Sequence, residues 1–236
     1  MKDFLEMIIN LFYPSLCAHC KKNNPTTGRS ICNPCISQLG TFKTYRCFRC
    51  DYPFKKSSSP NCPDCNAIQF VFDQSRSVYS LNNVGKKIIH QIKFQRKSYL
   101  LNNFKTDLIN KFRTEYENKE IDYLIPLPSS FFRTVERGFT PSEQITKMLH
   151  QEFKIPVLKN IFYKAHRKRQ SLSSRKERLT NQIHSFKIRP TSLLENKTLL
   201  VVDDIFTTGA TVNELSKVAR NFGAKTVFVL TLFRSP

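Results

Sequence analysis

Residues 199–211, LLVVDDIFTTGAT, carry the strongest indication of a fold in this sequence. Lys197–Val202 is short and apolar, as expected of a buried strand, and Val212–Phe222 follows with apolar residues at helical spacing. Gly209 stands in the turn between them, where a glycine allows a positive φ and a close backbone approach. Because backbone N–H groups at the positive end of a helix suit a phosphate dianion, we predict a phosphate site in this turn.

Two adjacent acids, Asp203 and Asp204, follow the apolar strand directly. Two carboxylates at the end of a buried strand are costly without a partner, which favours a ligand site over a plain strand, turn and helix. The acids would accept hydrogen bonds from sugar hydroxyls beside the phosphate. A P-loop is excluded, since GxxxxGK[ST] is absent from the sequence. The predicted sugar-phosphate site consists of Asp203, Asp204, Thr207, Thr208, Gly209, Ala210 and Thr211.

Strands and helices alternate on both sides of this stretch. The hydrophobic fraction of 40% and the 20 Phe residues are enough to bury a core. Alternation of the two element types predicts an α/β fold with a parallel, helix-covered sheet. The predicted strands are 68–80, 121–127, 197–202 and 226–232. The predicted helices are 84–113 with a break around 95–98, 141–153 and 212–222.

All eight cysteines lie between residues 17 and 65, in four CxxC pairs that each begin 15 residues after the previous pair. Two such thiolates can turn toward one ion about 2.3 Å away, and two pairs complete a tetrahedral Zn²⁺ site. Four pairs at a fixed period predict two structural zinc sites rather than disulfides or a redox pair. His19, inside the first pair, is expected to face solvent. The predicted ligands are Cys17, Cys20, Cys32, Cys35, Cys47, Cys50, Cys62 and Cys65.

The pairing of the four motifs has two alternatives. A sequential arrangement, which we favour, gives two zinc ribbons in tandem, and a crossed arrangement joins alternate pairs. A segment this short builds a poor apolar core alone, so the metal would supply the missing stability. No cysteine follows Cys65. We therefore expect an N-terminal helix and double zinc-ribbon domain over residues 1–67 and a second domain over 68–236.

The 236-residue chain is strongly basic, with 38 Lys+Arg against 18 Asp+Glu and a net charge of +20. Such a charge indicates a polyanionic partner such as nucleic acid or phosphorylated metabolites, or it only keeps the protein soluble. No apolar run approaches the roughly 18 residues of a membrane span. Residues 1–14 lack the basic region and cleavage site of a secretory signal, so we expect a cytoplasmic protein.

The segment VVDDIFTTGAT resembles the phosphoribosyl-pyrophosphate (PRPP) signature of type I phosphoribosyltransferases. Together with the eight-cysteine N-terminus, nearly the whole chain resembles the ComF family of competence proteins, which are phosphoribosyltransferase-like. Thr140 departs from the usual Asn of this family, and Ser173 departs from a common Leu. Two more segments carry the resemblance: Pro126–Pro128 with Arg133, Arg137, Gly138 and Phe139, and the set Gln170, Arg178, Asn181 and Phe186.

This resemblance implies a type I phosphoribosyltransferase-like parallel sheet with helices on both faces, preceded by a small zinc-ribbon domain. It implies that Asp203 and Asp204 hold the ribose hydroxyls and that the main chain of 207–211 holds the 5′-phosphate. The pyrophosphate would lie in the loop Leu127–Gly138, with Arg133 and Arg137 as anion ligands, and Mg²⁺ would bridge pyrophosphate and ribose oxygens. The reaction would displace pyrophosphate with a nitrogen nucleophile, although no general base stands out and turnover is left open.

The resemblance also implies a role in handling incoming single-stranded DNA during natural transformation, with DNA-uptake or helicase proteins as partners. The alternative is a phosphoribosyltransferase of nucleotide or amine metabolism without a DNA role. Residues 164–178 form a dense basic segment that would contact nucleic acid, close over PRPP as a lid, or only face solvent. A second basic run, Lys86–Tyr99, offers Phe94 and Tyr99 for base stacking, although core packing is expected for Phe94. The predicted nucleic-acid or lid residues are Arg167, Lys168, Arg169, Arg175 and Arg178.

Overall fold

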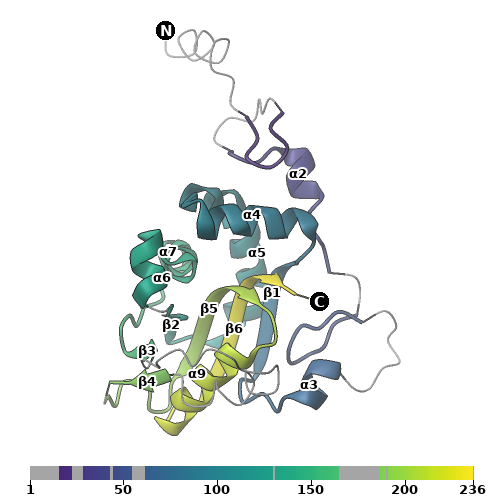
Figure 1. Ribbon diagram of the computed structural model, residues 1–236. Coiled ribbons are helices and arrows are strands. Elements are labelled where there is room, and N and C mark those ends of the chain that lie inside the picture. Colours follow the sequence, from purple (N-terminus) through teal and green to yellow (C-terminus); the bar gives the residue numbers. More distant parts are fainter. Residues whose placement is uncertain are drawn as a thin grey trace, which may run out of the picture.

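The computed structural model describes most of the chain (Figure 1). The described residues are 16–22, 29–42, 45–54, 62–129, 131–164, 186–189 and 191–235, with the side chains of 131–133 excepted. The expected N-terminal helix therefore lies outside the described residues. So do Arg167, Lys168, Arg169, Gln170, Ser173, Arg175, Arg178 and Asn181. Among the helices of the described part, none is long and apolar enough to cross a membrane.

A four-stranded parallel sheet forms the centre of the protein, with strand order β1-β6-β5-β2. The two middle strands have the sequences TLLVVDDIF and TVFVLTLFR and are buried along most of their length. Continuous apolar runs of this kind are typical of parallel strands covered on both faces. The strands are β1 (Gln74–Ser80), β2 (Tyr123–Pro126), β5 (Thr198–Phe206) and β6 (Thr226–Arg234).

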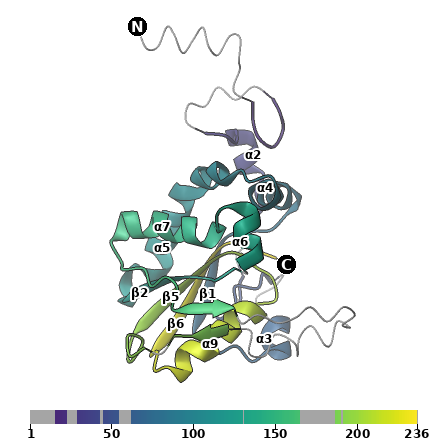
Figure 2. The same ribbon diagram turned by 60° about the vertical axis from the view of Figure 1, so that its left-hand side comes forward.

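Helices cover both faces of this sheet (Figures 1 and 2). One face packs against α4 (Asn83–Phe94), α5 (Lys105–Tyr116) and α7 (Pro141–Phe153), and the other packs against α9 (Ala210–Asn221). Alternate residues of β5 enter the two resulting cores, because successive strand side chains point to opposite faces. Leu200 and Val202 belong to the first core and Leu199 and Val201 to the second. The expected α/β architecture is thus confirmed.

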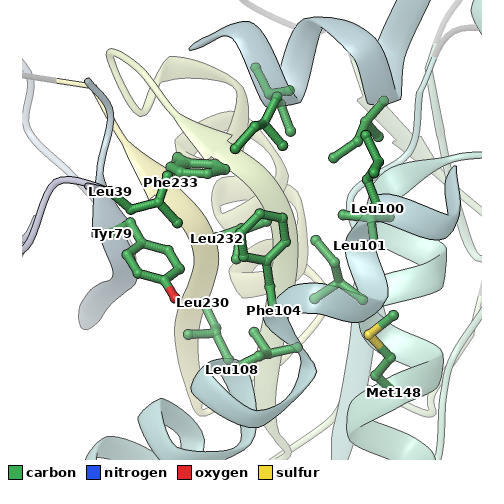
Figure 3. Packing of buried hydrophobic residues seen from close by; sticks show 14 of the residues in the cluster. Leu39, Tyr79, Leu100, Leu101, Phe104, Leu108, Met148, Leu230, Leu232 and Phe233 are labelled. Atoms are coloured by element: carbon green, nitrogen blue, oxygen red, sulfur yellow. The ribbon is translucent and has the colours of Figure 1, made fainter. Parts of the chain in front are cut away.

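The first core is the larger of the two, and Figure 3 shows part of it. Side chains of β6 pack against those of the helical segment 83–116. This segment breaks after Phe94, as the sequence predicts, and continues as the 3-10 helix η1 (Ser98–Phe104) and α5. The labelled side chains are Leu39, Tyr79, Leu100, Leu101, Phe104, Leu108, Met148, Leu230, Leu232 and Phe233.

Phe94 does not enter this core, contrary to expectation, and its side chain is 63% exposed. It is the last residue of α4, whose buried positions are Gly85, Ile88, Ile89 and Ile92. Phe94 follows Ile92 by two residues, and residues two apart lie on different sides of a helix. The buried stripe of α4 therefore leaves Phe94 on the solvent side.

Shorter elements complete the described structure. The remaining helices are α2 (Asn33–Ser37), α3 (Pro63–Ala67), α6 (Phe131–Arg137) and the 3-10 helix η2 (Glu117–Lys119). The strands β3 (Phe162–Lys164) and β4 (Phe186–Ile188) form a separate antiparallel pair. The helix α6 lies inside the segment that the sequence predicts as a pyrophosphate loop, and Gly138, with φ +75°, follows its last residue.

Two cysteine-rich segments dock at different places on the α/β part of the protein (Figure 1). The first ribbon carries the cysteines from Cys17 to Cys35, and the second ribbon carries those from Cys47 to Cys65. The first lies beside α4 and η1, where Asn103 Oδ1 accepts hydrogen bonds from the N–H groups of Ser30 (3.0 Å) and Ile31 (3.1 Å). The second lies against β1, where the Ser75 N–H donates to the Arg49 carbonyl at 2.7 Å. Each ribbon therefore contacts its own part of the α/β domain.

Candidate phosphate site and zinc centres

Two clusters of four cysteine sulfurs lie in the N-terminal part of the chain. Within each cluster, the ligand atoms all lie within 4.8 Å of one another. Tetrahedral coordination at a Zn–S length of 2.3 Å places sulfurs about 3.8 Å apart, and the Sγ atoms of Cys20 and Cys32 lie 3.8 Å apart. The grouping is the sequential one that the sequence favours. The clusters are Cys17, Cys20, Cys32 and Cys35, and Cys47, Cys50, Cys62 and Cys65.

His19 does not face solvent as expected. Its ring is half-buried, and its Nδ1 atom lies 3.5 Å from the Cys35 Sγ atom. The Cys32 N–H also approaches the Cys17 Sγ atom at 3.4 Å. Contacts of this kind orient the sulfurs that bind a metal. We correct the prediction accordingly: His19 lies against the first cluster rather than on the surface.

The turn between β5 and α9 (residues 207–209, the phosphate turn) has the positive-φ glycine that the sequence predicts. Gly209 caps the helix with φ +73°, and its carbonyl accepts a hydrogen bond from the Asn213 N–H at 2.8 Å. Thr207 and Thr208 are exposed. The first N–H groups of a helix have no partner within the helix, so the start of α9 can donate to an anion.

Asp203 and Asp204 are the sixth and seventh residues of β5 rather than the start of the turn. Asp204 is 5% exposed, and its Oδ2 atom lies 2.6 Å from the Lys93 Nζ atom at the end of α4. Burial raises the pKa of Asp203 well above its ordinary value, and the neighbouring Asp204 carboxylate raises it further, while the Lys93 ammonium opposes both effects. The two acids thus share one cation in a crowded position.

The predicted pyrophosphate segment meets the same end of α4. The guanidinium of Arg137, the last residue of α6, lies 5.3 Å from the ring centroid of Phe94. The His90 ring also contacts Phe94, with its centroid 4.8 Å from that of Phe94. The end of α4 thus has two contacts: Phe94 with Arg137, and the preceding Lys93 with Asp204. The side chain of Arg133 lies outside the described residues.

Two further residues at this site escaped the sequence analysis. Lys93 belongs to the basic run 86–99 but carries no motif of its own. Arg234 ends β6, is 1% exposed, and donates from Nη1 to the Thr207 carbonyl at 2.8 Å. A charged residue at the end of a long apolar strand was the signal for Arg234, the same signal that identified Asp203 and Asp204.

Comparison with known proteins separates the chain into the same two parts. A double zinc ribbon domain family matches residues 8–66, and the phosphoribosyl transferase domain family matches residues 135–236. The competence protein ComFC of Bacillus subtilis (strain 168) is 28% identical over 212 residues, which cover 87% of this chain and 84% of that protein. The chain belongs to the ComF family.

Two other relatives of this ComF-family chain align over nearly their full length. Competence protein F of Haemophilus influenzae is 24% identical and covers 95% of this chain and 99% of its own. The DNA utilization protein YhgH of Shigella flexneri is 26% identical, with the same two coverages. The family assignment agrees with the observed parallel sheet, the cysteine clusters and the loop after β5. The double zinc ribbon match and the sulfur geometry together support zinc as the metal of the ComF N-terminal segment.

Proposed function

We propose that this ComF-family protein binds PRPP with Mg²⁺ at the loop between β5 and α9. One observation carries the proposal: two neighbouring carboxylates near the end of the buried strand β5 are separated by two residues from a helix-opening turn in which Gly209 has φ +73°. Buried carboxylates are costly unless they serve a partner, and the start of a helix favours a phosphate. A ligand that carries both a phosphate and sugar hydroxyls matches this arrangement, because the phosphate suits the helix start and the hydroxyls suit the carboxylates.

The residues divide the proposed ligand between them. Asp203 and Asp204 accept hydrogen bonds from the ribose hydroxyls, and the backbone of 207–211 donates to the 5′-phosphate. Arg137 faces the pyrophosphate from α6, with Arg133 proposed as a second cation of that segment. Mg²⁺, a hard cation that prefers carboxylate and phosphate oxygens, would be held at the two acids and the bound phosphates. Lys93 lies beside Asp204 and adds positive charge where the ligand is anionic.

Binding and turnover are separate steps in this proposal. In the reaction, a nitrogen nucleophile forms a bond to C1 of the ribose while the bond to pyrophosphate breaks. The groups that this chain supplies act by positioning and by stabilising negative charge, which are sufficient means of catalysis in such displacements. Pyrophosphate release upon addition of candidate nucleobases and amines tests turnover.

Titration calorimetry with PRPP and Mg²⁺ tests binding. The wild type is expected to bind, and the double variant Asp203→Asn/Asp204→Asn is expected to lose binding. Asp122→Asn serves as the matched control, because Asp122 is an acid near the opposite end of β5 that pairs with Lys197. Equal binding by the wild type and the double variant, or absence of binding by the wild type, contradicts the proposal.

Handling of single-stranded DNA is the second candidate function. The relatives are named for competence and for DNA utilization, and the chain carries a net charge of +20. The specific observation is the exposure of Phe94 (63%), which contacts Arg137, and of Tyr99 (50%) in the same basic run 86–99. Exposed aromatic rings among cations are the groups on which bases of single strands stack. We propose that this surface and the basic residues Arg167, Lys168 and Arg169 contact the strand.

Fluorescence anisotropy with a labelled oligonucleotide at several salt concentrations tests this candidate. Neutralising Arg167, Lys168 and Arg169 is expected to lower the salt dependence, and Phe94→Ala is expected to weaken binding about tenfold at fixed salt. Phe222→Ala is the control, since Phe222 is also exposed (39%) but follows α9, which covers the face of the sheet opposite to α4. Salt-independent binding, or equal effects of the two Phe variants, contradicts the assignment.

A further inference from the structure

Arg234 joins three parts of the protein that are distant in sequence. Its guanidinium is almost completely buried, with 1% of the residue exposed. Nε donates to the Cys50 carbonyl at 3.1 Å, Nη1 donates to the Thr207 carbonyl at 2.8 Å, and Nη2 pairs with the Asp64 carboxylate. One side chain therefore links the last strand, the second cysteine cluster and the phosphate turn.

On the ribbon side, both partners of Arg234 belong to the metal-binding motifs. Cys50 is a member of the second cluster, and Asp64 lies between Cys62 and Cys65 in the short helix α3. The positions of the Cys50 carbonyl and of Asp64 therefore depend on the fold of this ribbon. A zinc ribbon owes much of its stability to its metal, because its apolar core is small. Loss of the second zinc would release both partners of Arg234.

On the loop side, the packing is equally direct. The Arg234 Cζ atom lies 4.6 Å from the ring centroid of Phe206, the residue before Thr207. Gly209 rests on Phe206 and Phe70, since a Cβ atom at Gly209 would lie 2.4 Å and 2.8 Å from carbons of these rings. Phe70 comes directly after the second ribbon in the chain. The phosphate turn thus packs on Phe206 of β5 and on Phe70 of the segment that follows the second ribbon.

The start of α9 is held by this segment as well. Asn213 Oδ1 accepts a hydrogen bond from the Val71 N–H at 2.7 Å, and its Nδ2 donates to the Gln69 carbonyl at 3.2 Å. The first ribbon has other contacts: the Gln91 Nε2 of α4 donates to the Ala18 carbonyl at 3.0 Å. Among the described residues, the second ribbon is thus linked to the phosphate turn through Arg234 and through the segment that follows the ribbon. The first ribbon contacts α4 and η1 instead.

We infer that Arg234 is a positioning residue through which the second zinc ribbon orders the anion-binding turn, so that metal in this ribbon controls anion binding at the turn. The effect of Arg234 on the order of the turn can be measured in the protein without a ligand. Its effect on PRPP binding rests on the proposed function. The second ribbon is accordingly a part of the phosphate site, whereas the described residues of the first ribbon contact α4 and η1.

Hydrogen exchange of the backbone amides of 213–216, which begin with the Asn213 N–H bonded to the Gly209 carbonyl, tests the role of Arg234 in the full zinc-loaded chain. Arg234→Lys keeps the charge but cannot reach three partners, and we expect exchange in this segment to be at least about tenfold faster. Arg76→Lys is the matched control: Arg76 is also buried and donates to a carbonyl of the same ribbon, that of Phe48 at 2.8 Å, and pairs with Glu115. Unchanged exchange in Arg234→Lys, or an equal increase in Arg76→Lys, overturns the inference.

A second pair of variants tests the metal itself. Cys47→Ser removes a ligand of the second cluster and Cys20→Ser a ligand of the first, and both sulfurs are half-buried. We expect faster exchange at 213–216 in Cys47→Ser and wild-type exchange in Cys20→Ser. The same change in both variants, or in neither, overturns the specific role of the second ribbon.

A reciprocal effect distinguishes control of binding from a purely structural role. If zinc tightens anion binding, the anion must retain zinc by the same factor. Mg²⁺ with PRPP is expected to raise the equilibrium affinity for zinc, measured by competition with a chelator, in Cys20→Ser, which keeps the second site. An unchanged zinc affinity despite measured PRPP binding contradicts the inference. If PRPP does not bind, the proposed function fails, while the exchange experiments still decide whether the ribbon orders the turn.

Discussion

The Lys93 ammonium lies 2.6 Å from the Asp204 carboxylate. This contact joins the end of α4 to β5 across more than a hundred residues of sequence, and it lies within the larger core face of the sheet. The side chain of Asp204 is 7% exposed, so its charge is compensated by a specific cation rather than by solvent. The contact therefore fixes α4, and with it Phe94 and Arg137, beside the proposed ribose site.

Removal of this cation is expected to cost both stability and affinity. Lys93→Met leaves a buried carboxylate without its partner, which lowers the free energy of unfolding by about 2 kcal/mol. Affinity for Mg²⁺ with PRPP falls by about tenfold, since one cation near an anionic ligand is lost. Thermal unfolding and calorimetry measure the two effects. Lys93→Arg, which keeps the charge, should retain most of both, and a loss equal to that of Lys93→Met would exclude an electrostatic role.

The raised pKa of Asp203 predicts a stabilising substitution at the proposed site. A carboxyl whose pKa is higher in the folded than in the unfolded state stabilises the fold below its unfolded pKa, and that contribution is lost as the pH rises through the folded pKa. Asp203→Asn puts a neutral amide in place of the carboxyl. It therefore removes the cost of burying the charged form and its repulsion by the Asp204 carboxylate. At neutral pH we expect a gain of about 1 kcal/mol in unfolding free energy and a loss of PRPP binding.

The same substitution has a defined pH dependence. The advantage of Asp203→Asn over the wild type should shrink as the pH falls and Asp203 becomes protonated. Asp122→Asn supplies the opposite sign, because a hydrogen bond from the Thr198 N–H and the nearby Lys197 lower the pKa of Asp122. That variant should be less stable than the wild type at neutral pH. Melting temperatures measured from neutral to acidic pH report both trends. A stability advantage of Asp203→Asn that does not change with pH would exclude the charge of Asp203 as its cause.

Two glycines with nearly the same φ separate backbone strain from close packing. Gly138 has φ +75° and nothing within 4 Å of an added Cβ, whereas Gly209 has φ +73° and two phenylalanine rings within 3 Å. Gly138→Ala should cost only the left-handed strain of about 1 kcal/mol. Gly209→Ala should cost about 2–4 kcal/mol, because Phe206 and Phe70 must move as well. Denaturant unfolding compares the two variants, and equal losses would exclude packing at Gly209.

Zinc content follows from the two sulfur clusters. We expect two zinc ions per wild-type chain and one in either Cys20→Ser or Cys47→Ser, since a tetrahedral site uses all four sulfurs of its cluster. Removal of all zinc with a chelator should lower the melting temperature, because metal binding contributes to folding. Elemental analysis and thermal unfolding check these expectations. One zinc in the wild type would contradict the two-site interpretation.

The sequence by itself predicted the local chemistry of this protein. A run of apolar residues followed by Asp203 and Asp204 predicted a buried strand and a turn at a helix start, because strand burial, glycine conformation and helix termini depend on neighbours in the chain. The four CxxC motifs predicted metal clusters for the same reason. The boundary between the two domains remains a prediction.

Partners that come from distant segments required the tertiary structure. Lys93 reaches Asp204 only because α4 packs across the sheet, and Phe94 is exposed because Ile88 and Ile92 occupy the buried stripe of that helix. Arg234 meets Cys50 and Thr207 because the second ribbon folds back onto the end of β6. Short-range spacing determines which groups a segment can offer, whereas packing of non-local segments determines which of those groups meet.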